Sequence, residues 1–278
     1  MNQLTLHSPA KLNLFLHITS QRADGYHNLQ SVFQLIDLCD VMHFDISHQT
    51  LSINAVDNVA YDQNISLKAA QLLQQHTKYQ GGCHIHIEKN IPIGGGLGGG
   101  SSNAATTLLA LNSLWQTGLT LAQLARLGLQ LGADVPVFIL GQNAWAEGVG
   151  EQLTAVELPK TDYIVLKPDC FISTKQLFSQ ESLTRHTPEI TFTTYQQYPL
   201  QCGNNFEALA QQLYPPVAEA LAYLNQFGQA RLTGTGSCIF VAVQPEQDIT
   251  SILQQAPCTS FFCHGLQQSP VHRQLGLL

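Results

Sequence analysis

The 278-residue chain has few charged residues: they make up 11% of it, and only 12 are Lys or Arg. The net charge of −7 and the lack of any basic run argue against a surface that neutralises nucleic-acid phosphates or an anionic membrane. Apolar residues nevertheless reach 44%, which is typical of a globular chain rather than a disordered one. The composition therefore predicts a folded protein with no nucleic-acid and no membrane partner.

Long apolar runs and cysteine pairs are also missing. No predominantly apolar segment is long enough to span a bilayer, and the start of the sequence lacks the cationic segment of a signal peptide. The seven cysteines are scattered without a CxxC pair, which favours buried, reduced thiols and argues against zinc. His84 and His86 share a strand face but lack a third ligand, so we expect them to face solvent. These features predict a cytoplasmic protein in which no residue is assigned as a metal ligand.

The hydrophobic pattern divides the chain into two halves. The first half shows strand patterns at 12–18, 41–47 and 83–89 and helical spacing at 64–76, 103–115 and 119–131. After a plausible junction, "AVELPKT", the second half shows strands at 162–168, 230–234 and 238–243 and helices near 204–213 and 217–227. The order is not a regular βαβ alternation, so it predicts an α+β fold of two domains, residues 1–155 and 156–278.

Glycine is concentrated in one place: "IPIGGGLGGGSSNAAT", residues 91–106, has six glycines in seven positions. Each glycine loses extra conformational entropy on folding, so the run needs a physical reason. It follows a strand that ends near Ile87 and precedes a helix expected to begin at Asn103, an arrangement that directs backbone N–H groups and a helix dipole at one spot. A di- or triphosphate is the predicted ligand. Valine at Gly98 or Gly99 is expected to block it without disturbing the fold.

Two common phosphate loops do not fit this run. The P-loop pattern GxxxxGK[ST] is absent, because no lysine lies between Lys89 and Arg126. Gly94, Gly96 and Gly99 satisfy GxGxxG, but the dinucleotide fingerprint also needs a second strand and an acidic residue about 20 positions on. Here another helix follows, and no Asp or Glu occurs between Glu88 and Asp134. An acidic chain with few cations is expected to bind polyphosphate mainly through backbone amides.

Two further segments accompany the glycine run. In "SPAKLNL" near the start, Lys11 and Asn13 share one strand face, and "LTGTGSC" at 232–238 is a second, shorter glycine turn. In this order the three segments resemble the motifs of the GHMP kinases. Together with "RADGYH", "LGADVPVF" and "AEGVGE", they are similar to the GHMP kinases that act on 4-diphosphocytidyl-2-C-methyl-D-erythritol. The resemblance runs from about residue 8 to "SPVHR", although 180–202 carries no motif that we recognise.

The resemblance implies a two-domain GHMP kinase fold with the active site in the cleft between the domains. The implied reaction transfers the γ-phosphate of ATP, bound with Mg²⁺, to the 2-hydroxyl of the methylerythritol unit, a step of non-mevalonate isoprenoid synthesis. Positioning and electrostatics would supply most of the catalysis, without a covalent intermediate. The implied partners are these small molecules, with the chain acting as a monomer or weak homodimer.

The resemblance also assigns residues. Asp134 would be the catalytic base and Lys11 would pair with it, although local sequence alone makes a helix N-cap equally plausible for Asp134. Asn13 would help to position the substrate, while Tyr26 and Phe178 would stack on opposite faces of the cytosine and His27 would hydrogen-bond to it. The residues assigned to ATP are Pro92, Ile93, Gly94, Gly95, Gly96, Leu97, Gly98, Gly99, Gly100, Ser101, Ser102 and Asn64, the last of which could equally be an N-cap.

Two alternatives stay open at this point. Another GHMP kinase, of the homoserine or mevalonate type, would share the glycine run but not "ADGYH" with its partner aromatic. A non-catalytic nucleotide-binding protein would bind ATP without needing Asp134. One departure also matters: some GHMP relatives hold Mg²⁺ with a helix glutamate, but no acidic residue follows Ser101 and Ser102 in the expected helix.

Overall fold

The computed structural model describes residues 2–47, 49–56 and 59–277. Within these ranges the strands are β1 (Gln3–Gln21), β2 (His27–Asp45), β3 (Leu51–Ile53), β4 (Cys83–Glu88), β5 (Ala144–Glu147), β6 (Gln152–Ala155), β7 (Asp162–Lys167), β8 (Arg231–Leu232), β9 (Ile239–Ala242) and β10 (Thr259–Leu266). The α-helices are α1 (Ile65–Thr77), α2 (Gly99–Leu114), α3 (Leu121–Leu129), α4 (Val135–Leu140), α5 (Thr174–Phe178), α6 (Phe192–Gln197), α7 (Glu207–Leu213), α8 (Pro215–Leu224), α9 (Ile249–Gln254) and α10 (Pro270–Leu275).

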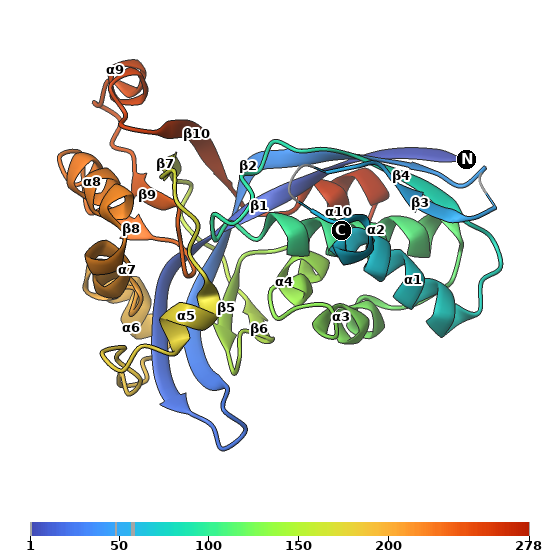
Figure 1. Cartoon of the computed structure of the whole chain (residues 1–278), viewed down its shortest axis with the longest axis horizontal. Coiled ribbons are helices and arrows are strands. Elements are labelled where there is room, and N and C mark those ends of the chain that lie inside the picture. Colours follow the sequence, from blue (N-terminus) through green and yellow to red (C-terminus); the bar gives the residue numbers. More distant parts are fainter. Residues whose placement is uncertain (1, 48, 57–58, 278) are drawn as a thin grey trace.

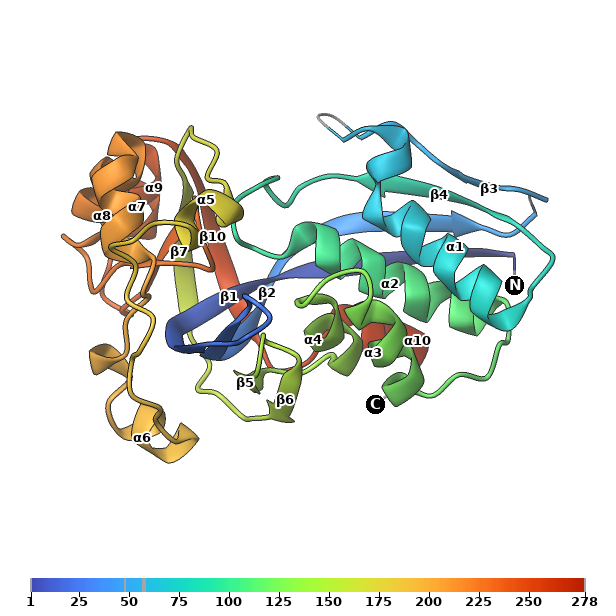
Figure 2. The same ribbon diagram turned by 60° about the horizontal axis from the view of Figure 1, so that its bottom comes forward.

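The elements gather on two sides of a long β-hairpin (Figure 1). On one side, α1 to α4 and α10 pack with β1 to β4 around the larger hydrophobic core. On the other side, α7 to α9 pack against β7 to β9 around a second core. Figure 2 shows β1 and β2 running between the two groups. This mixture of strands and helices confirms the predicted α+β class.

One sheet path joins the two sides, in the order β3-β4-β2-β10-β7-β9-β8. Strand β10 makes the link, because its residues 259–264 pair with β7 and its last two pair with β2. The following helix, α10, returns to the first side, where Val271 is buried in the larger core. The domain division after residue 155 falls between β6 and β7 and stays a prediction.

Strands β1 and β2 are longer than the sequence pattern predicted. They pair antiparallel from Gln3 opposite Asp45 to Gln21 opposite His27, with register shifts after Pro9, Asn13 and Ile18. Buried polar side chains, among them Lys11 and Asn13, interrupt the apolar alternation that marks a strand in sequence. The hairpin therefore places polar side chains in the middle of the molecule. The same side chains weaken the apolar pattern by which the two strands could be recognised in the sequence.

The start of α2 corrects the sequence prediction. The helix begins at Gly99, not Asn103, because Gly98 caps it in the left-handed conformation with φ 73°. Residues 99–102 are therefore the first helical turn rather than loop. The N–H groups of such a turn have no intrahelical acceptors and remain available to an anion.

The segment 180–202, which had no recognised motif, has a packing role. It contains α6, whose Tyr195 stacks on Phe15 of β1 with ring centroids 5.2 Å apart. Trp145 of β5 completes this small aromatic cluster. In the described part of the chain, every helix is too short or too polar to cross a membrane.

Candidate active site

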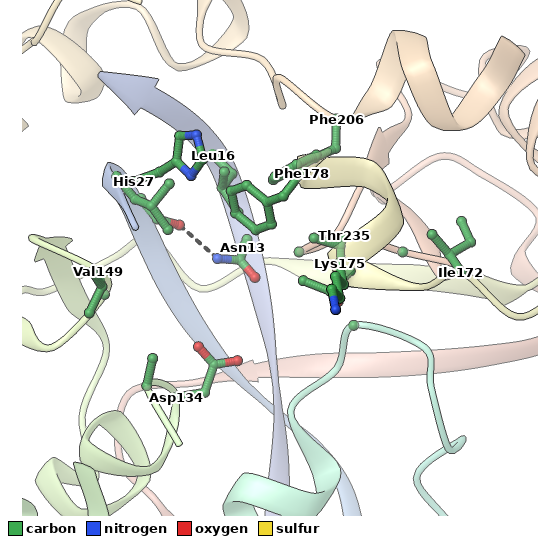
Figure 3. Close-up of a pocket in the computed structure, with 18 of the residues that line it drawn as sticks. Asn13, Leu16, His27, Asp134, Val149, Ile172, Lys175, Phe178, Phe206 and Thr235 are labelled. Atoms are coloured by element: carbon green, nitrogen blue, oxygen red, sulfur yellow. Dashed lines mark hydrogen bonds between the residues drawn. The ribbon is translucent and has the colours of Figure 1, made fainter. Parts of the chain in front are cut away.

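Two pockets lie on either side of the glycine run. A large cleft of about 1050 Å³ opens between the two sides of the molecule and is drawn in Figure 3. A smaller pocket of about 380 Å³, here called the loop pocket, lies between the glycine run and the start of α1. Gly94, Gly96 and Gly98 line both. The glycine run is therefore the wall that the two pockets share.

The backbone of the run turns its carbonyl groups toward the protein. Gly94, Gly96 and Gly98 have φ between 71° and 76°, a region that residues with a Cβ rarely adopt. The carbonyls of Gly95 and Leu97 accept hydrogen bonds from the backbone N–H groups of Cys238 and Lys11. With its acceptors used in this way, the run can offer N–H donors to a phosphate, as the sequence predicted.

The space around the glycines corrects the expectation that valine at Gly98 or Gly99 would leave the fold undisturbed. A Cβ on Gly98 would lie 2.9 Å from the ring of Phe138, and one on Gly99 would lie 2.9 Å from Ile91. Valine at either position would therefore disturb the protein itself, so normal folding is not expected. At Gly100 the nearest atom is a methyl of Ile65 at 3.6 Å, which is ordinary contact. Gly100 is the position where a side chain can test the ligand space.

A buried carboxylate that the sequence reasoning missed fixes the glycine run. Asp40 of β2 accepts hydrogen bonds from the backbone N–H groups of Asn90 and Ile91 at 2.8 and 2.9 Å, just before the glycines. Its other oxygen binds the Lys89 ammonium and the Asn103 amide of α2. Asp40 thus ties together the two ends of the run. Strand β2 also contains Asp37 and Asp45 among several other polar residues, so no local sequence pattern marked Asp40.

Lys11 and Asp134 meet in the cleft, as predicted. The buried Lys11 ammonium lies 3.3 Å from a carboxylate oxygen of Asp134, whose side chain is 35% exposed. The same ammonium donates to the side-chain oxygen of Asn13 and, at 3.0 Å, to the carbonyl of Gly96. An ammonium has three N–H donors, so each contact can have one. The cation therefore connects the carboxylate to the glycine run.

The position of Asp134 separates two interpretations of the sequence. Asp134 is the residue before α4, but its side chain makes no capping hydrogen bond. Figure 3 shows the carboxylate in the cleft instead. Asn13 is oriented by the protein, because its side-chain amide donates to Ser31 at 2.9 Å, the dashed bond of Figure 3.

The other end of the cleft holds aromatic residues. The His27 ring stacks on Phe178 of α5, with centroids 4.9 Å apart and planes 28° from parallel. His27 is buried, and its Nε2 has no hydrogen-bond partner among the described residues. Burial, with the Arg185 charge as a smaller cause, lowers the pKa of His27, which favours a neutral ring. Tyr26 lies at the rim and is 66% exposed.

All six residues assigned to catalysis or to the cytidine substrate line the large cleft. Of the residues assigned to ATP, all but Ser102 line the loop pocket. Ser102 is buried, and its hydroxyl lies 2.7 Å from that of Ser8. Asn64 reaches the pocket but also caps α1 by accepting from the N–H of Ser66. These binding roles remain predictions, and Ser102 has the weakest geometric support.

The cleft also has lining residues to which sequence reasoning gave no role. The second glycine turn contributes Gly234, Thr235 and Gly236, and the segment at α5 contributes Thr174 and Lys175. The hydroxyls of Thr174 and Thr235 lie 2.8 Å apart, which joins these segments. Their separation in sequence concealed this arrangement.

Metal-binding side chains do not gather anywhere in the described ranges: they contain no group of three or more His, Cys, Asp or Glu that could hold an ion. His86 is exposed, whereas His84 is partly buried beside Ser52 at 2.9 Å. The prediction that both rings face solvent thus needs correction at His84.

The chain is similar to known proteins in both sequence and fold. The GHMP kinases N terminal domain matches residues 64–142, and the GHMP kinases C terminal domain matches residues 197–261. A protein of Acinetobacter baylyi named 4-diphosphocytidyl-2-C-methyl-D-erythritol kinase is 60% identical over 267 residues, covering 95% of this chain and 96% of the relative. One of Herminiimonas arsenicoxydans with the same name is 51% identical, covering 90% of each chain.

Solved structures agree in fold. The crystal structure of a 4-(cytidine 5'-diphospho)-2C-methyl-D-erythritol kinase superposes with a TM-score of 0.81 at 28% identity, covering 94% of this chain and 99% of that one. A mevalonate kinase of Methanococcus jannaschii, at 19% identity and a TM-score of 0.72 over 95% and 98% of the two chains, shares the fold. The predicted GHMP kinase fold is confirmed. By sequence and by fold, the chain belongs to the 4-diphosphocytidyl-2-C-methyl-D-erythritol kinase family of the GHMP kinases.

Proposed function

We propose that this chain transfers the γ-phosphate of ATP to the 2-hydroxyl of 4-diphosphocytidyl-2-C-methyl-D-erythritol, giving the 2-phosphate and ADP. The observation that carries the proposal is the Lys11–Asp134 pair, in the cleft and bonded through Lys11 to the glycine run. The relatives described above bear the name of a kinase for this compound. The product would serve isoprenoid precursor synthesis.

The two pockets suit the two substrates. ATP would occupy the loop pocket, with its phosphates against the N–H donors of the glycine run and the first turn of α2. The cytidine compound would occupy the large cleft, with its base near His27 and Phe178 and its sugar alcohol near Asp134. The γ-phosphate and the 2-hydroxyl would then meet at the wall that the pockets share.

The chemistry at that wall needs a base and a cation. Asp134 accepts the proton of the 2-hydroxyl while the oxygen of that hydroxyl forms a bond to the γ-phosphorus. The bond from the γ-phosphorus to the β,γ-bridging oxygen breaks, and ADP leaves with that electron pair. Lys11 stabilises the negative charge on the transferred group from a fixed position, because Asn13 and Gly96 hold its ammonium in place.

Mg²⁺ would come to this site with ATP. Asp134 is the carboxylate that the cleft offers, while the Ser102 hydroxyl is turned into the protein. The donor set therefore fits an ion held mainly by phosphate oxygens and water, with Asp134 within reach, and not a metal bound by the protein alone. When bound, the ion would neutralise phosphate charge.

The cellular compartment and the oligomeric state are inferred from the cysteines and from the size of the substrates. All seven cysteines are unpaired, which supports a reducing compartment, and we infer the cytoplasm. Substrates of this size need no partner chain, and we infer a monomer or weak homodimer.

A coupled assay for ADP with a panel of alcohols tests the proposal. The purified chain should release ADP with the cytidine compound but not with homoserine or mevalonate. Turnover of homoserine or mevalonate would instead indicate another GHMP kinase. ATP binding without turnover of any alcohol would indicate a non-catalytic nucleotide-binding protein.

A further inference from the structure

The large cleft has little free positive charge for a ligand that contains a diphosphate. Two cationic side chains, Lys11 and Lys175, are found among the described residues that line it. Against them stands Asp134, in a chain whose net charge is −7. A cytidine diphosphate group brings further negative charge, so its phosphates need a cation that is not already neutralised.

Lys11 cannot supply that cation. It is buried, and its ammonium is engaged by Asp134, Asn13 and Gly96. These contacts use its three donors and place its charge at the catalytic carboxylate. Lys175 differs on both counts, because it is exposed and its amino group has no hydrogen bond or ion pair to any described residue.

The position of Lys175 matches the middle of the substrate. Lys175 and Phe178 both belong to α5 and are three residues apart, so their side chains leave neighbouring parts of one helix face. Figure 3 shows Lys175 beside Thr235, on the same wall of the cleft as Phe178. In the substrate, a ribose separates the base from the diphosphate. A base near Phe178 therefore brings the diphosphate toward Lys175.

We propose that Lys175 binds the diphosphate of the cytidine compound and distinguishes a nucleoside diphosphate from a nucleoside in the large cleft. The assignment rests on the proposed function and adds the residue that recognises the phosphates. Lysine acts at phosphate as a mobile point charge, which suits a group placed at the exposed mouth of a cleft.

Calorimetric binding of CDP and of cytidine, without ATP, tests the assignment. The Lys175→Gln variant should weaken CDP binding by about tenfold, the size of one charge-assisted contact at an exposed site. Cytidine binding should change by less than about twofold, because cytidine has no phosphate. The Lys175→Arg variant should keep most of the CDP affinity. Lys160→Gln, which removes an exposed lysine outside the cleft, should change neither.

Kinetics provides the second readout. In Lys175→Gln, the KM for the cytidine compound should rise by a similar factor, with kcat and the KM for ATP unchanged. The KM increase should shrink at high salt, because an exposed ion pair is screened.

Three results would overturn the assignment. Equal losses of CDP and cytidine binding would mean that Lys175 only supports the fold of the cleft. A higher KM for ATP instead would place Lys175 with the phosphate donor. A variant that binds both CDP and cytidine as tightly as the wild type would refute the role of Lys175 alone and leave the proposed function intact. If the wild type bound neither compound, the proposed substrate class itself would fail.

Discussion

The two pockets beside the glycine run differ in the parts of the chain that line them. Most of the loop pocket comes from one stretch, residues 92–101, in which six of the ten residues are glycines without a side chain. The large cleft draws side chains from β1, β2, α5 and the second glycine turn, which are far apart in sequence. A backbone wall can select a ligand by charge and shape. A wall of side chains can also read which base is present, so specificity should reside in the large cleft.

The difference also predicts how each pocket fails. Adding volume should damage the loop pocket, whereas deleting side chains should damage the cleft. The two pockets are connected by the hydrogen bond that the Lys11 ammonium donates to the carbonyl of Gly96.

Removing the base should give the largest effect. In the Asp134→Asn variant, kcat should fall by about 10²–10⁴-fold, the range for a positioned proton acceptor. The Kd for ATP should stay nearly unchanged, because the loop pocket does not include Asp134. Lys11→Ala should also lower kcat, and the double variant should lose less than the sum of the two because the groups act together. Steady-state kinetics measures kcat, and titration with ATP measures the Kd. Near-normal turnover of Asp134→Asn would remove Asp134 from the role of base.

Adding volume at Gly100 should separate the pockets. In Gly100→Val the added Cβ has room, because its nearest neighbour is a methyl of Ile65 at 3.6 Å, and the methyl groups should take up space in the loop pocket. The Kd for ATP should therefore rise at least about 30-fold, or about 2 kcal/mol. Cytidine binding and the melting temperature should change little. Gly100→Ala should give a smaller loss of the same kind. A folded Gly100→Val variant with wild-type ATP affinity would refute the phosphate role of this turn.

Deleting an aromatic ring should affect the cleft alone. Stacking on an aromatic is worth about 1–3 kcal/mol per base. For Phe178→Ala we expect the lower part of that range, a 5- to 30-fold rise (about 1–2 kcal/mol) in KM for the cytidine compound, because His27 already covers one face of the ring. The preference for cytidine over uridine should also narrow, because His27 loses its support. Phe262→Ala, an exposed ring outside the cleft, is the control. A higher KM for ATP would mean that the two pockets have been assigned in reverse.

Acid should give the smallest effect. Burial lowers the pKa of His27 below its ordinary value of 6.5, so the neutral ring persists as the pH falls to that value. The preference for cytidine over uridine should therefore change by less than about twofold between pH 8 and pH 6.5 and decline only below it. Competitive binding of the two nucleosides across this range measures it. A decline that is complete above pH 7 would show a charged His27 and contradict this environment.

The same contrast explains what the sequence could predict. The glycine wall of the loop pocket could be predicted because one contiguous motif contains it. That Lys11 and Asp134 lie together could be expected from the family resemblance of their two short motifs. Asp40, Thr235 and the proposed phosphate ligand Lys175 were missed because segments that are distant in the sequence come together around them. The start of α2 was misplaced because glycine has low helix propensity, whereas the cap at Gly98 and the anchoring by Asp40 override it.

The return of α10 to the first half has a consequence for synthesis on the ribosome. Val271 and His272 are buried there, and the His272 ring lies 2.9 Å from the carbonyl oxygen of Ile139 on α4. The helix that directly follows the proposed base, Asp134, is thus contacted by a residue translated more than a hundred positions later. The nascent chain cannot finish its larger core until that last helix emerges, so protease resistance of stalled chains should appear only once residues 270–275 are outside the tunnel.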